Sequence, residues 1–112
     1  RDMARIAMAA YRNPVIRDAV RRKSYTFTRN DGRTITLKST NDLLGNMPEC
    51  NGMKTGYTNA SGRCLISTAT SRGRHVILVQ LGTKTKYIWN DARTLMTWGL
   101  QRAKSAGVAA NW

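Results

Sequence analysis

Three strand-like segments stand close together in the second half of the chain, separated only by short glycine-containing turns. The segments read GMKTGYT over 52–58, RCLISTATS over 63–71 and HVILVQLG over 75–82, and they are joined by TNASG and SRGR. Turns this short connect antiparallel neighbours, so the segments are predicted to form a three-stranded antiparallel meander. The third segment is almost continuously apolar, which predicts a strand buried on both faces.

The rest of the chain predicts helices beside this sheet. Residues 1–11 carry apolar side chains at helical spacing, and Asn13 before a proline predicts the cap of a second helix over 14–20. A two-stranded ribbon is expected over 24–39, around an Asn-Asp-Gly turn, and a last helix over 87–103. The expected core residues of that last helix are Trp89, Met96 and Trp98. A chain of 112 residues accommodates one domain, here of the α+β class, with an antiparallel sheet flanked by helices.

The two cysteines, Cys50 and Cys64, do not have the spacing of a metal-binding CxxC motif, and the single histidine of the chain cannot complete such a site. No metal or cofactor is expected. A disulfide would need an oxidising compartment, and the simplest hairpin register, with Tyr57 opposite Gly62, places Cys64 opposite Thr55 rather than Cys50. The sequence leaves the disulfide open, and Cys64 is expected to be a small buried apolar side chain.

The chain is strongly basic, with 19 Lys and Arg, 6 Asp and Glu, and a net charge of +13. Such a charge attracts polyanions, whether nucleic acid, anionic lipid headgroups or an acidic wall polymer. The cluster Arg17, Arg21, Arg22 and Lys23 lacks the interleaved aromatic residues of a single-strand binder and is interpreted as a solvated face. No nucleic-acid partner is therefore expected.

The strand-like segment over 52–58 carries residues that a strand does not need for packing. Lys54, Thr55 and Thr58 are polar, and Gly52 and Gly56 weaken a strand. Glycine in a strand allows another backbone to approach closely. This composition predicts a ligand lying along the segment.

Lys54-Thr55-Gly56 on a strand resembles the third motif of the penicillin-recognising serine enzymes, which carry Ser-x-x-Lys, Ser-x-Asn and Lys-Thr-Gly. Six segments match, in order, the C-terminal half of the low-molecular-weight D-alanyl-D-alanine carboxypeptidases: RDMARIA, NPVIRDAV, YTF, NDLLG, CNGMKTGYTNASGRCLISTA and TLMTWGL. The resemblance reaches about Leu100. It implies the C-terminal part of a β-lactamase/transpeptidase-like fold, with 1–103 as an incomplete catalytic domain and 104–112 as a tail or linker.

The resemblance also implies a role for each residue of the motif. Lys54 supplies positive potential in the cleft, and Tyr57 contributes its backbone N–H to an oxyanion hole. Thr55 donates its hydroxyl to the substrate carboxylate and Thr58 assists it. Gly56 lets the substrate lie along the strand as an added strand. The implied substrate is the D-Ala-D-Ala end of the peptidoglycan stem peptide, and β-lactams are the implied covalent inhibitors.

The other two family motifs are not found at their expected places. The sequence contains no Ser-x-x-Lys, and its nearest equivalent is Thr83-x-x-Lys86. Ser39-Thr40-Asn41 spells Ser-x-Asn, but it stands close before Lys54, where the family has an ordinary loop, and is interpreted as a coincidence. Because the chain also opens on Arg1 inside a helical pattern, we expect a fragment. The nucleophile is expected on an N-terminal part of the same protein, present as a companion chain outside the cytoplasmic membrane, in the periplasm or on the wall side.

A second hypothesis comes from a different class. The chain could be a non-catalytic basic module that binds nucleic acid or anionic wall polymer through a transpeptidase-like half-fold. A steep fall in polyanion affinity with salt would favour the module, and β-lactam acylation of a companion chain would favour the enzyme.

Overall fold

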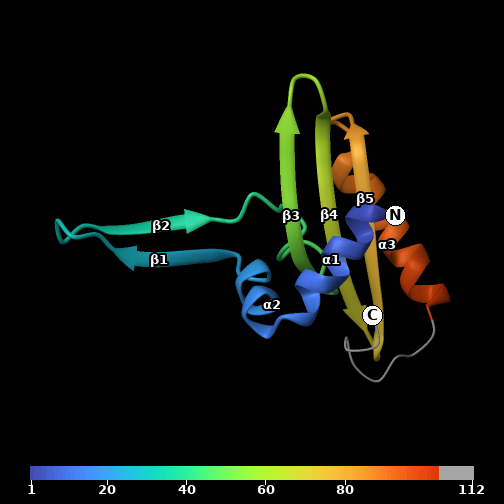
Figure 1. Ribbon diagram of the computed structural model, residues 1–112, viewed down its shortest axis with the longest axis horizontal. Helices are drawn as coiled ribbons and strands as arrows, with labels where there is room; N and C mark the ends of the chain where they lie inside the picture. The colour runs from blue at the N-terminus through green and yellow to red at the C-terminus, as the bar shows by residue number, and fades with distance from the viewer. Residues whose placement is uncertain (104–112) are drawn as a thin grey trace.

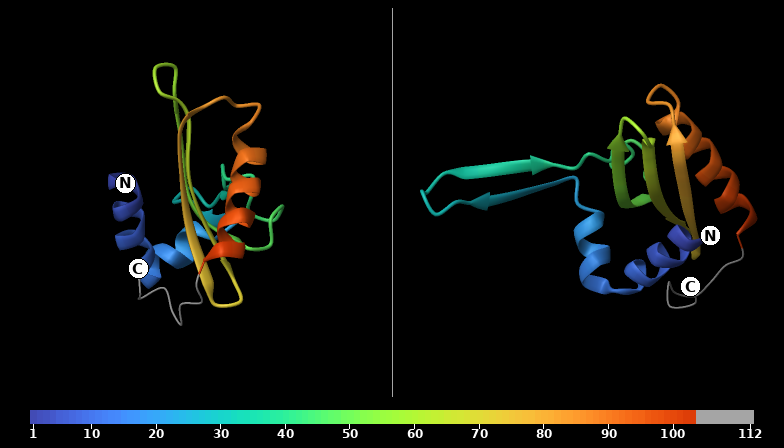
Figure 2. Two further views of the ribbon diagram at one scale, coloured as in Figure 1. Left: turned by 90° about the vertical axis from the view of Figure 1, so that its right-hand side faces the viewer. Right: turned by 45° about the horizontal axis from the view of Figure 1, so that its top comes forward.

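The computed structural model describes residues 1–103, and the tail expected over 104–112 lies outside them. Three helices and five strands follow one another in the order α1 (Asp2–Arg12), α2 (Pro14–Val20), β1 (Ser24–Thr28), β2 (Thr34–Lys38), β3 (Cys50–Thr58), β4 (Gly62–Ser71), β5 (Arg74–Thr83) and α3 (Ile88–Arg102). The strands form a two-stranded ribbon, β1-β2, and an antiparallel sheet of order β3-β4-β5. The predicted α+β class and the meander are confirmed. Figure 2 shows α1 and α3 on opposite faces of the sheet.

The junction between the first two helices follows the predicted cap. The side chain of Asn13 accepts hydrogen bonds from the backbone N–H of Val15 (2.9 Å) and of Ile16 (3.4 Å). Pro14 occupies the first helical position, where a missing N–H costs nothing. After α2 the chain enters the ribbon, which projects away from the sheet (Figure 1).

The β3–β4 hairpin has a register one residue different from the predicted one. Thr58 pairs with Gly62 and Tyr57 with Arg63, so Cys64 lies opposite Gly56 rather than Thr55. The physical reason is the turn. Gly62 has φ +70°, and this left-handed residue allows a turn of three residues between the strands.

The register also settles the disulfide that the sequence left open. Cys50 pairs with Ala69, near the opposite end of the hairpin from Cys64, and both thiols are free. Six residues of extended strand separate Cys50 from the position opposite Cys64, or about 20 Å, which a disulfide cannot span. Cys64 is only half-buried, so its predicted burial is wrong.

The hydrophobic core lies between the sheet and α3. Leu65 and Ala69 of β4 pack with Ile88, Ala92 and Met96 of α3, and Leu43 and Met47 from the loop before β3 close the core. The predicted core role is confirmed for Met96, and Trp89 is half-buried and packs against this core. Trp98 is 55% exposed, which contradicts the prediction, and the Arg102 guanidinium lies 4.5 Å from the centre of its ring.

Strand β5 is less buried than its apolar sequence predicted. Val76 and Leu78 pack against the core under α3, but the neighbouring positions of β5 are half-buried and Leu81 is 66% exposed. The prediction of burial on both faces is therefore wrong for the part of the chain that the structure describes. The reason is the position of β5 at the edge of the sheet, where α1 covers only part of its second face.

Candidate active site

Strand β3 is the other edge of the sheet, because within residues 1–103 only β4 pairs with it. An edge strand presents a row of backbone N–H and C=O groups to which an extended peptide can add as a further strand. The predicted ligand-binding segment therefore lies where an added strand has access. Its outer edge also faces the ribbon side of the molecule (Figure 1).

The side chains of the motif divide between the two faces of the sheet. Thr55 lies opposite Leu65, a core residue under α3, so Thr55 points to the α3 face. Successive residues of a strand alternate, so Lys54 and the Cα hydrogens of Gly56 point to the face that carries α1 and α2. Lys54 is exposed, and its ammonium group donates a hydrogen bond to the backbone carbonyl of Thr55. No carboxylate within residues 1–103 forms an ion pair with Lys54, so its positive charge is not neutralised locally.

 On the α3 face the motif borders a cavity with a volume of about 130 Å³, below the roughly 300 Å³ at which pockets for drug-sized ligands begin. Thr40, Thr55, Tyr57 and Arg63 line it, with Ile88 and Trp89 of α3 beneath. The hydroxyl oxygens of Thr40 and Thr55 lie 2.5 Å apart, within hydrogen-bonding distance. The cavity is thus a small polar recess beside the edge of β3.

Tyr57 and Thr58 are held by the hairpin turn. The Tyr57 hydroxyl donates to Asn59 Oδ1 (3.1 Å), and the Arg63 guanidinium lies 4.7 Å from the centre of the Tyr57 ring. Thr58 Oγ1 accepts from the backbone N–H of Ser61 (3.0 Å) and lies 2.6 Å from Ser61 Oγ. The Thr58 hydroxyl therefore has a partner in the turn, and its predicted contact with substrate stays a prediction.

The two glycines of β3 have different surroundings. A Cβ placed on Gly52 would lie 2.7 Å from Thr68 Oγ1 and 3.1 Å from Val20 Cγ2, both in packed positions. A Cβ placed on Gly56 would have no heavy atom within 4 Å among the residues that the structure describes. Gly52 is therefore explained by packing within the chain, whereas the space beside Gly56 is open to a ligand.

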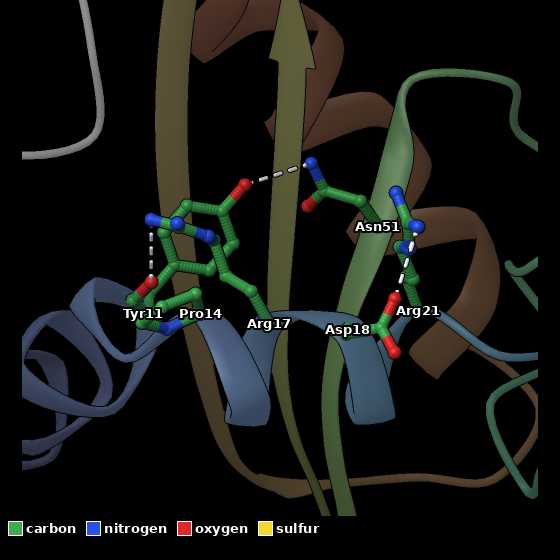
Figure 3. Close-up of a pocket in the computed structure, with 6 residues that line it drawn as sticks. All are labelled: Tyr11, Pro14, Arg17, Asp18, Arg21 and Asn51. Atoms are coloured by element: carbon green, nitrogen blue, oxygen red, sulfur yellow. Dashed lines mark hydrogen bonds and ion pairs between the residues drawn. The ribbon is translucent and has the colours of Figure 1, made fainter.

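A polar network fixes the beginning of β3 against the helices (Figure 3). The Asn51 amide nitrogen donates to the Tyr11 hydroxyl (2.9 Å) and to Thr70 Oγ1 (3.0 Å), and Asn51 Oδ1 accepts from Thr68 Oγ1 (2.7 Å). Thr70 Oγ1 also lies 3.0 Å from His75 Nδ1. This network holds the backbone three residues before Lys54 to α1 and to the centre of the sheet.

Four ionisable groups within residues 1–103 have shifted pKa values, and all lie outside the motif. A hydrogen bond and charge from Asp18 raise the pKa of Arg22. Hydrogen bonds and charge from Arg22 and Arg21 lower the pKa of Asp18. Burial, with a smaller contribution from Arg17, lowers the pKa of His75. Burial raises the pKa of the Cys50 thiol. Within residues 1–103 no three His, Cys, Asp or Glu side chains come together as a metal site.

The profile of the D-alanyl-D-alanine carboxypeptidase family matches residues 1–85. The chain belongs to this family. A D-alanyl-D-alanine carboxypeptidase of Mycobacterium tuberculosis is 29% identical over 97% of the chain, and one of Escherichia coli is 34% identical over 90%. The chain spans 38% and 25% of the lengths of these two relatives.

Solved structures place this carboxypeptidase-family chain in the DD-peptidase fold. The Streptomyces K15 DD-transpeptidase matches 90% of the chain with a TM-score of 0.83 and 32% identity, and the match covers 41% of that protein. Penicillin-binding protein D2 of Listeria monocytogenes, in its ampicillin-bound form, matches 79% of the chain with a TM-score of 0.67 and 35% identity. The predicted family and fold are confirmed, for a chain that corresponds to part of each relative.

The Ser39-Thr40-Asn41 segment, which is interpreted as a coincidence, and the Thr83-x-x-Lys86 segment have other surroundings in the fold than a catalytic motif would need. Ser39 Oγ accepts from the backbone N–H of Asn41 (3.1 Å), and the buried Asn41 side chain accepts from the N–H of Leu43 (3.1 Å), so both form the loop before β3. Thr83 ends β5, and the Lys86 ammonium lies 5.6 Å from the centre of the Tyr87 ring.

Sequence reasoning missed two residues beside the motif, Thr40 and Arg63. Thr40 belongs to the Ser-x-Asn segment, which the sequence alone gives no catalytic role, and only the folded loop shows its contact with Thr55. Arg63 lies across the hairpin from Tyr57, a pairing that the shifted register concealed. Its guanidinium is oriented by a hydrogen bond from Nε to Thr85 Oγ1 (3.1 Å).

Proposed function

We propose that this chain is the C-terminal part of the catalytic domain of a serine-type D-Ala-D-Ala carboxypeptidase that acts on peptidoglycan stem peptides. The observation that carries the proposal is the Lys-Thr-Gly segment on the exposed edge of β3, in a chain that belongs to the carboxypeptidase family. The family assignment favours an enzyme over a non-catalytic basic module. The proposed location is outside the cytoplasmic membrane, where this substrate is found.

The nucleophile is proposed to come from an N-terminal part of the same protein. The sequence has no Ser-x-x-Lys, and the chain corresponds to 41% of the Streptomyces K15 DD-transpeptidase. In the assembled enzyme the serine hydroxyl attacks the carbonyl between the two D-alanines, and the terminal D-Ala leaves with the proton that the serine gives up. Water then hydrolyses the acyl-enzyme and restores the serine.

The residues of β3 are proposed to bind and polarise the substrate. The substrate backbone adds to the edge of β3 beside Gly56, where the space is open. Thr55 donates its hydroxyl to the terminal carboxylate, which the charges of Lys54 and Arg63 attract. The backbone N–H of Tyr57 stabilises the oxyanion together with the N–H of the nucleophile. Thr58 supports this binding from the turn.

The test is release of D-alanine from diacetyl-L-Lys-D-Ala-D-Ala by this chain together with the N-terminal part. Lys54→Gln removes the charge at the edge of β3 and should lower kcat/KM by about 100-fold or more, the order found for loss of one transition-state electrostatic contact. Lys86→Gln, a loss of an exposed lysine outside β3, is the matched control and should change kcat/KM less than about twofold. Equal effects of the two variants would overturn the proposed role of Lys54.

A further inference from the structure

Asn51 is the extra residue of a β-bulge at the beginning of β3. The register of β3 on β4 shifts between Cys50 and Gly52, and within the described ladder Asn51 has no paired residue. Ladder hydrogen bonds do not fix a bulged residue, and a bulge sets the course of the strand that follows it. Here the strand that follows carries Lys54, three residues on. The course of the Lys-Thr-Gly segment therefore depends on what holds Asn51.

The side chain of Asn51 holds the bulge in place of the ladder. Its amide nitrogen donates to the Tyr11 hydroxyl of α1 and to Thr70 Oγ1 of β4, and its carbonyl oxygen accepts from Thr68 Oγ1 (Figure 3). Both amide hydrogens are thus used, which fixes the orientation of the amide. The bulge is held to a helix and to the central strand by side-chain hydrogen bonds.

These hydrogen bonds continue to a titratable side chain, His75 of β5. Thr70 Oγ1 lies 3.0 Å from His75 Nδ1 and 3.5 Å from the Tyr11 hydroxyl. A hydroxyl has one hydrogen to donate, and the shorter contact assigns it to Nδ1 of a neutral His75. An imidazolium donates from both ring nitrogens, so Nδ1 can then no longer accept. The Thr70 hydrogen must turn towards Asn51, where it meets another donor, or towards the Tyr11 oxygen, to which Asn51 already donates. Either orientation weakens the hold on Asn51.

The charges around His75 act in the same direction. His75 pairs with Thr70 and so lies on the face of the sheet that carries α1 and α2. Within residues 1–103, the titratable or charged groups that face it from these helices are Tyr11, whose ring centre is 6.5 Å away, and Arg17, whose guanidinium lies over the Tyr11 ring. On β5 itself, Arg74 donates to the last carbonyls of α3 instead. A charge on His75 is therefore repelled by Arg17, which separates α2 from the sheet.

We propose that Asn51 is a positioning residue for the Lys-Thr-Gly strand, and that protonation of His75, relayed by Thr70, loosens its hold. With His75 neutral, the bulge is fixed and the edge of β3 is in place for a ligand. With His75 protonated, the edge is in place less often, by about two- to tenfold, the effect of losing one hydrogen bond. The catalytic part of this assignment rests on the function proposed above: the enzyme loses activity in acidic surroundings.

The relay is tested by NMR titration of this chain together with its N-terminal part. The ring signals of His75 are identified by their absence from His75→Gln, and the side-chain amide signals of Asn51 by their absence from Asn51→Ser. Between pH 8 and pH 5 we expect the Asn51 amide to shift with the same midpoint as the His75 ring. Thr70→Val removes the hydroxyl and should abolish this shift, whereas Thr70→Ser keeps a hydroxyl and should retain it.

The positioning role is tested by the rate of acylation with fluorescent penicillin at pH 8 and at pH 5. The ratio of the rate at pH 8 to that at pH 5 should be about two- to tenfold smaller in His75→Gln and in Thr70→Val than in the parent protein. Thr70→Ser should retain the parent ratio. Lys86→Gln, which removes an exposed charge outside the network, is the control and should also retain it.

The two measurements separate this inference from the proposed function. An Asn51 amide that does not follow His75, or follows it equally in Thr70→Val, would overturn the relay. A working relay with equal acylation ratios in the parent protein and His75→Gln would overturn the positioning role. A working relay without any penicillin label at either pH would refute the carboxypeptidase and leave the relay established.

Discussion

The same added methyl group should destabilise the protein at Gly52 of β3 and leave its stability almost unchanged at Gly56. In Gly52→Ala the new Cβ would lie 2.7 Å from Thr68 Oγ1, and Thr68 is completely buried, so it has no free space to move into. Overpacking costs about 1–3 kcal/mol, and displacing Thr68 weakens its hydrogen bond to Asn51 by about 1 kcal/mol more. We expect a loss of about 2–4 kcal/mol, which corresponds to a Tm lower by about 10 °C or more. Thermal unfolding followed by circular dichroism measures it.

Gly56→Ala is the matched control, because its Cβ would meet no atom within 4 Å. Its stability should change by no more than about 0.5 kcal/mol. Its rate of penicillin acylation should instead fall by about tenfold or more, since a methyl group displaces the ligand from the strand edge. A Gly52→Ala/Thr68→Ala double variant should cost less than the two single changes added together. Equal stability of the two alanine variants would refute this explanation of the glycines.

Three further predictions concern the core and the ionisable side chains. Leu65→Ala should lower the free energy of unfolding by about 2–5 kcal/mol in urea titrations, because Leu65 is 1% exposed in the centre of the core. The pKa of His75 is lowered in the folded state, so the unfolded chain binds more protons, and the free energy of unfolding should fall as the pH drops below about 6.5. The urea midpoints of His75→Gln at pH 5 and pH 8 should therefore differ less from each other than those of the parent protein. Cys64 should react with iodoacetamide before Cys50, because burial raises the pKa of the Cys50 thiol. Peptide mapping identifies the site that is modified first, and modification of Cys50 before Cys64 would contradict the prediction.

Local signals were sufficient to predict most of the elements. The Asn13-Pro14 pair, the Asn-Asp-Gly turn of the ribbon and the two glycine-containing turns of the meander each specify a backbone conformation within a few residues. The predicted register of the β3–β4 hairpin was wrong by one residue, because the left-handed conformation of Gly62 in the turn decides the register of the whole hairpin.

Burial was harder to predict, because it depends on which elements cover a segment. The apolar sequence of β5 is the same whether one or both faces are covered, and its position at the sheet edge leaves Leu81 exposed. Trp98 likewise lies on the outer side of α3 despite its helical spacing. The sequence alone predicted the Lys54-Thr55-Gly56 segment of the candidate site. Thr40 and Arg63 could not be predicted, because they reach this segment only through the folded loop before β3 and the register of the β3–β4 hairpin.

The most direct test of the central claim is labelling of the protein and its N-terminal part with fluorescent penicillin, followed by denaturing electrophoresis and intact mass of every band. We predict a covalent label on the part that carries Ser-x-x-Lys, none on this chain, and slower labelling when Lys54 is replaced by Gln. A label on this chain itself, or labelling at the same rate with Lys54→Gln, would contradict the account.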